Sequence, residues 1–104
     1  MSPTMKRTLR ERQRRIRDAE RGRIAKARFW ALSARCAGFM VGEWREGRAP
    51  TVFAYEGQLI ASLRAALCLQ GWPWRPADEV ARAIVAAALD RLGAERPDWY
   101  EGQP

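Results

Sequence analysis

The chain has 104 residues, 47% of them hydrophobic, which allows one small domain with a modest core. Its formal charge is +7, and this charge is concentrated in residues 1–35, where 12 basic residues accompany only three acidic ones, whereas residues 36–104 hold seven basic and nine acidic residues. The charge is therefore not spread evenly over the chain. A basic arm joined to a mildly acidic body indicates a polyanionic partner.

The first predicted element is one long helix from Met5 to Ala37, with Thr4 as its N-cap. This stretch contains no proline and a single glycine, Gly22, and good helix formers dominate it. A helix of roughly 33 residues would be about 50 Å long. That is longer than a domain of this size is wide, so part of it should project, and Gly22 is its weakest point.

Arginines recur along this helix at spacings of three, four and seven residues. At about 100° per residue they fall within an arc of roughly 80°, and the stripe drifts by about 20° per heptad. Guanidinium groups make planar, bidentate contacts to phosphate and to guanine edges. The candidate nucleic-acid contacts are therefore Arg7, Arg10, Arg14, Arg17, Arg21 and Arg28, and Arg35 ends the stripe.

Apolar residues divide this long helix into two parts. Before Gly22 only Met5, Leu9 and Ile16 oppose the arginines, too few for a coiled-coil seam or for burial in a membrane surface. After Ile24 bulky residues follow, so this half should pack on the body. We therefore expect an exposed basic helical arm over residues 1–23 and a small helical domain over residues 24–104.

In composition the first 25 residues resemble arginine-rich RNA-binding motifs and the basic regions of leucine-zipper factors. The asparagine-alanine-alanine core and the zipper of the latter are absent. The resemblance implies binding of nucleic acid and does not define a family.

The segment at about residues 39–50 is short and glycine-rich, and it is either a hairpin or an irregular loop. The loop is favoured, because an isolated two-stranded hairpin is marginal in water. A second helix is predicted from Thr51 or Tyr55 to Leu69, and a third from Pro76 to about Leu92, with Gly93 as its C-cap. The predicted fold is all-α, with these two helices packed as an antiparallel pair on the second half of the long helix.

The tryptophans and the tail complete the predicted body. Trp30 is expected in the core, and Trp44, between two charged residues, is the candidate for a partner contact. Trp72 and Trp74 either cover the small core or stack on bases. The irregular tail after Ala94 is expected to dock on the body through its two aromatic residues, Trp99 and Tyr100.

The residue types disfavour catalysis and metal binding. There is no histidine, and Cys36 and Cys68 lie far apart in sequence, so a four-ligand zinc site cannot be built within the chain. Neither a nucleophile elbow nor a glycine-rich phosphate loop is present. We expect no enzymatic activity, no metal and no cofactor, and two reduced thiols in a cytoplasmic protein.

These patterns predict a small non-enzymatic nucleic-acid-binding protein whose arginine stripe contacts phosphates, with DNA slightly preferred over RNA. The helical body would serve dimerisation or partner docking, so a homo-oligomer is one expectation. The alternative is an adaptor or inhibitor protein whose basic arm docks on an acidic protein surface. No membrane association is expected, because the longest apolar stretch, Phe29 to Val41, has 13 residues and contains Arg35.

Overall fold

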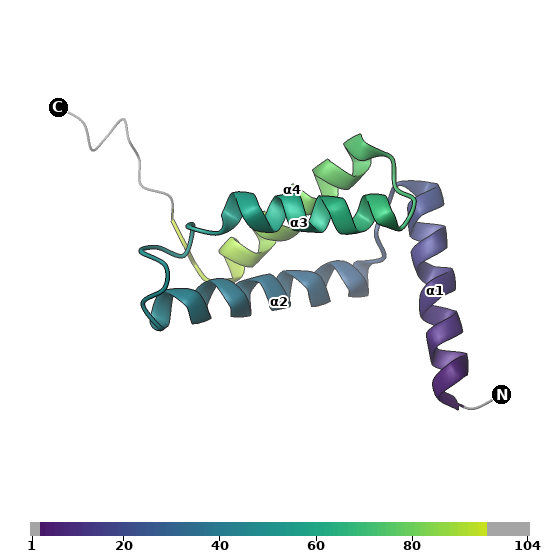
Figure 1. Cartoon of the computed structure of the whole chain (residues 1–104), viewed down its shortest axis with the longest axis horizontal. Helices are drawn as coiled ribbons and strands as arrows, with labels where there is room; N and C mark the ends of the chain where they lie inside the picture. The colour runs from purple at the N-terminus through teal and green to yellow at the C-terminus, as the bar shows by residue number, and fades with distance from the viewer. Residues whose placement is uncertain (1–2, 96–104) are drawn as a thin grey trace.

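A computed structural model describes residues 3–95 of the chain and confirms the all-α class. Its helices are α1 (Pro3–Arg21), α2 (Lys26–Arg45), α3 (Glu56–Leu69) and α4 (Trp74–Arg91). α2, α3 and α4 pack together as the body, and α1 stands at one end of the body at a steep angle to α2 (Figure 1). The predicted docking of Trp99 and Tyr100 lies outside the described residues.

The prediction of one continuous helix over residues 5–37 is wrong, because the chain breaks between α1 and α2. Gly22 adopts a left-handed conformation with φ +61°. The Gly22 N–H donates to the Ala19 carbonyl at 3.2 Å and the Arg23 N–H to the Asp18 carbonyl at 3.1 Å. This is the Schellman pattern that ends helices at glycine. The arginine stripe is therefore also interrupted, and Arg28 and Arg35 belong to a different helix from the first five arginines.

The expected irregular or hairpin segment at about 39–50 is shorter than predicted, since α2 continues to Arg45. Turns occupy residues 46–55, and residues 3–95 contain no strand. Arg48 organises the first turn by donating to both Glu43 carboxylate oxygens, at 2.7 and 3.1 Å, and to Glu46. These hydrogen bonds from Arg48 hold the pKa of the Glu43 carboxyl below its usual range.

The core centres on α4, which packs against both α2 and α3. Its inward residues are small or branched and almost fully buried: Ala77, Ala81, Ile84, Val85 and Ala88. The alanines leave room for the neighbouring helices to approach closely. Met40 of α2 and Ile60 of α3 cluster with the inward residues from Ala81 onward, and Ala77 packs in a second cluster with Leu67 and Trp72. Burial of this apolar surface stabilises the body.

Polar contacts also join α3 to α4. Arg64 donates to Asp78 at 2.7 Å, and Arg82 donates to the other oxygen of the same carboxylate at 3.0 Å. These two hydrogen bonds lower the pKa of Asp78. The Arg64 guanidinium also lies over the ring of Trp74, 5.1 Å from its centroid.

The tryptophans differ in how deeply they are buried. Trp72 is buried with Ala19, Leu67 and Ala77, whereas Trp74 is 61% exposed. The prediction that Trp30 lies in the core is wrong. Its ring is 46% exposed and packs edge-on against Phe29 at the surface of α2. Phe29, which is half-buried, packs against the core in the place predicted for Trp30.

The conformation of Gly22 makes a testable prediction. Gly22→Ala should destabilise the fold by about 1–2 kcal/mol, because an L residue is strained at positive φ. The added Cβ would lie 3.4 Å from the Pro76 Cβ, an ordinary contact, so the cost arises from the backbone. Gly38→Ala is the control, since Gly38 lies within α2 with open space around it, and it should stabilise by roughly 0.5–1 kcal/mol. Urea unfolding measures both; equal destabilisation of the two variants would contradict this account.

Candidate nucleic-acid interface

The basic residues of α1 project from the body. Every residue from 4 to 17 is exposed, and Figure 1 shows α1 running away from the other three helices toward the N-terminus. Residues 4–21 include eight basic and three acidic residues. Such a helix has little tertiary burial to stabilise it, so its charge is available for contacts outside the fold.

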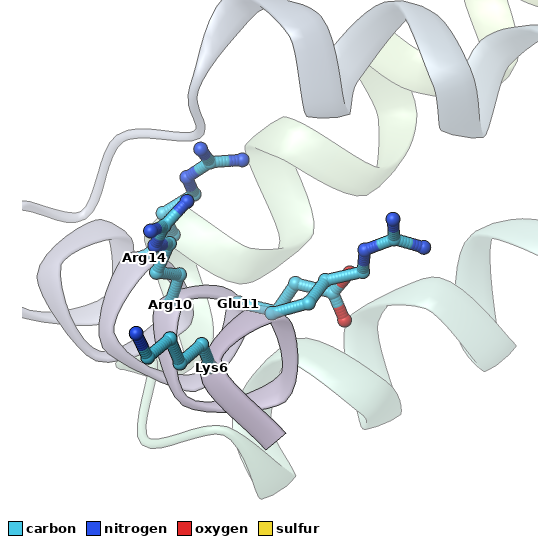
Figure 2. Close-up of a pocket in the computed structure, with 5 residues that line it drawn as sticks. Lys6, Arg10, Glu11 and Arg14 are labelled. Carbon is cyan, nitrogen blue, oxygen red and sulfur yellow. The ribbon is translucent and has the colours of Figure 1, made fainter. Parts of the chain in front are cut away.

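The arginine stripe of α1 consists of five residues that share one side of the helix: Arg7, Arg10, Arg14, Arg17 and Arg21. All five are exposed, and none takes part in an ion pair among residues 3–95. In Figure 2 the side chains of Arg10 and Arg14 extend from the same side of α1, whereas Glu11 extends from another. The stripe is thus an array of unpaired guanidinium groups.

Three apolar residues lie on the side of α1 away from the stripe, where Arg12 and Glu20 flank them. Met5, Leu9 and Ile16 lie within an arc of about 40° at helical spacing, and all three side chains are exposed. Ala19 continues this half of the helix but is buried against Trp72 and Leu67. Apolar burial therefore holds only the carboxyl end of α1 to the body.

Asp18 and Arg28 form the polar part of the same junction. The Asp18 carboxylate is buried and accepts hydrogen bonds from the Ala25 N–H at 3.3 Å and from Arg28 Nη1 at 3.1 Å. Arg28 Nη2 donates to Gln70 Oε1 at 2.7 Å. A carboxylate at the amino end of α2 also suits the helix dipole. These contacts link α1, α2 and the end of α3.

Arg28 is therefore placed apart from the five arginines with which sequence grouped it. Its guanidinium is turned toward Asp18 and Gln70. Arg35 is exposed, but it lies beside the apolar groove between α2 and α3. Sequence reasoning missed the partnership of Asp18 with Arg28. Gly22 was the available signal, because glycine ends helices in the left-handed conformation and so lets the following segment return toward the last turn of α1.

Trp44, the candidate partner contact, is 50% exposed near the end of α2. With Arg45, Arg91 and Val52 it lines a surface hollow of about 600 Å³. The structure thus brings an aromatic ring and two cations together at the end of the body far from α1 along α2.

Within residues 3–95, the acidic and sulfur-containing side chains do not gather into a metal site. Among residues 3–95, no three side chains of the types His, Cys, Asp and Glu lie close enough to hold a metal ion. Cys36 is buried and Cys68 half-buried, and both are free thiols. Burial raises the pKa of the Cys36 thiol.

Comparisons with protein-family models, with curated proteins and with solved structures found no match to this chain. None of the helices within residues 3–95 is long and apolar enough to cross a membrane.

Proposed function

We propose that this chain is a small non-enzymatic nucleic-acid-binding protein that contacts phosphates through the arginine stripe of α1. The observation that carries the proposal is the array of five exposed guanidinium groups on a projecting helix, none of which has an ion-pair partner within residues 3–95. Folding alone gives no reason to place them on one side. A phosphate backbone offers regularly spaced anions that such an array can contact, with release of condensed counterions.

The site needs no reactive group, because binding of this kind rests on charge and geometry. Arginine side chains bind phosphate oxygens bidentately. Arg7, Arg10, Arg14, Arg17 and Arg21 extend over about 14 residues of helix, or roughly 21 Å. That length is sufficient for contacts to several successive phosphates of one strand.

Neutralisation of the stripe tests this proposal. Arg7→Gln, Arg10→Gln and Arg17→Gln together should weaken binding to a labelled duplex at least tenfold at about 100 mM salt, and should flatten the slope of log affinity against log salt by about 2.7. Fluorescence anisotropy measures both quantities. Circular dichroism checks that the helices remain.

The matched control changes the same charge on the body. Arg45, Arg75 and Arg91 are exposed and form no ion pair among the described residues. Their combined change to Gln should leave the affinity within about threefold of the intact protein, because phosphate contacts made by α1 are preserved. Equal weakening by the two triple variants would refute a site on α1.

The second candidate is an adaptor or inhibitor whose α1 docks on an acidic protein surface. The exposed apolar side of α1, with Met5, Leu9 and Ile16, favours it, since amphipathic helices bind grooves through anchors at this spacing. If the intact protein binds no nucleic acid even at about 50 mM salt, where phosphate contacts are strongest, this candidate replaces the first.

A further inference from the structure

The angle between α1 and α2 encloses a hollow of about 580 Å³, here named the elbow cavity. It is lined by Glu11, Arg14, Arg15, Ala25, Ala27 and Arg28. Its size lies within the range of sites that hold ligands. Because α1 leaves the body steeply (Figure 1), the cavity opens to solvent between the two helices.

Two unpaired cations face this cavity. Glu11, Arg14 and Arg15 line the cavity. With Asp18 they follow the spacing i, i+3, i+4, i+7, which spreads them over about 100° around α1, with Arg14 at the edge nearest the arginine stripe. Asp18 is already paired with Arg28 and with the amide of Ala25, the N-cap residue of α2. Arg14 and Arg15 are exposed and have no ion pair among residues 3–95. The net attraction for an anion therefore comes from these two side chains and exceeds the repulsion from Glu11.

The walls of the cavity are held in place before any ligand arrives. The Schellman turn at Gly22, the capping of α2 by Asp18 and the hydrogen bond from Arg28 to Gln70 define the angle between the helices. A preformed angle spares a ligand the entropic cost of ordering the two helices. The junction therefore presents Arg14 and Arg15 at a defined angle to α2.

The shape of α1 selects among nucleic acids. An α-helix with its side chains is about 10–12 Å across, and the major groove of B-DNA is about 12 Å wide and 8.5 Å deep. The corresponding groove of A-form RNA is too narrow and deep for side chains to read. Residues 4–17 are exposed on all sides of α1, so no part of the body obstructs the entry of this segment into a groove.

We propose that α1 lies in the major groove of duplex DNA and that Arg14 and Arg15, in the elbow cavity, bind backbone phosphates of one groove wall. This inference rests on the proposed function and adds the class of nucleic acid and a second contact surface. With the arginine stripe toward the groove, Arg14 belongs to both surfaces, whereas Arg15 serves the elbow cavity alone. In this arrangement the start of α2 contacts the DNA backbone and limits how far α1 enters the groove.

The first test compares nucleic acids. The full chain is titrated by fluorescence anisotropy into a labelled DNA duplex, an RNA duplex of the same sequence and the DNA single strand, at about 100 mM salt. We expect binding to the DNA duplex to be at least tenfold tighter than to either competitor, because only its major groove admits the helix. Equal or tighter binding to RNA or to the single strand overturns the groove assignment, while the proposed function stands.

The second test isolates the elbow cavity. Arg15→Gln should reduce the salt slope on the DNA duplex by about 1, the contribution of one phosphate contact. Arg12→Gln is the matched control, since Arg12 is an exposed arginine of α1 that does not line the cavity, and its slope should match that of the intact protein. An unchanged slope for Arg15→Gln removes the elbow site. If no duplex binds at all, the proposed function itself fails.

Discussion

The affinity of the intact protein for a DNA duplex is expected to fall by about a thousandfold when salt rises from about 50 to 200 mM. The reason is that phosphate contacts release condensed counterions, and the slope of log affinity against log salt is about −0.9 for each phosphate neutralised. If the five arginines of the α1 stripe and Arg15 each contact one phosphate, as proposed, the six contacts correspond to a slope of about −5. Anisotropy titrations at four or five salt concentrations measure this slope.

A change of anion and a threshold value of the slope make the salt experiment decisive. Potassium glutamate in place of potassium chloride changes how strongly the anion competes for the arginines, but potassium ions are still released from the DNA. The affinity should therefore fall steeply with salt concentration in both salts. A slope shallower than about −2 would mean that no more than about two phosphates are contacted. Such a value would be incompatible with an interface that extends along α1.

The second large effect concerns stability. Arg28→Met should destabilise the protein by about 2 kcal/mol, because it leaves the Asp18 carboxylate buried without its cation. Removal of one partner of a buried pair costs about 3–5 kcal/mol, and we reduce this figure because the Arg28 side chain is 23% exposed and partly screened by water. For a domain of this size the change corresponds to a fall in Tm of roughly 10 °C. Thermal unfolding followed by circular dichroism measures it.

The control for this experiment is Arg23→Met, which removes an exposed cation between α1 and α2 and should alter stability by no more than about 0.5 kcal/mol. A double variant that combines Arg28→Met with Asp18→Asn removes the buried negative charge as well as its cation. Part of the stability lost in Arg28→Met should therefore return. If Arg28→Met is as stable as the intact chain, the junction is not held by this pair, and Arg28 returns to the candidate phosphate contacts.

The helical body was predictable because its signals are local. Apolar residues at helical spacing and the glycines at positions 71 and 93 placed α3 and α4 to within a few residues. Differences remained where local signals compete. Pro76 was expected to open the last helix, but α4 begins two residues earlier, at Trp74. The predicted irregular segment begins at about residue 39, yet Gly38 and Gly42 lie within α2, because burial of Cys36, Ala37 and Met40 outweighs the low helix propensity of glycine.

The fate of individual side chains was less predictable. Helical spacing places Trp30 near the core side of α2, but Phe29 and Leu32 pack against the core instead, and Trp30 remains exposed. Buried volume is limited in a domain of this size, so only a contact map decides which of two adjacent aromatics enters the core. Arg28 illustrates the same point, since its partners Asp18 and Gln70 come from other helices.

The sequence by itself determined the charge asymmetry, the all-α class and the spacing of the arginines along α1, because these depend on composition and on neighbours three or four residues apart. Only the tertiary structure decided that the chain turns at Gly22, that Arg28 is paired with Asp18 and that Arg15 faces a cavity with Arg14. The physical reason is that a helix can continue through a glycine or end there at similar free energy. Packing of Ala19 against Leu67 and Trp72 selects the turn, and the hydrogen bond from the Ala25 N–H to Asp18 closes it.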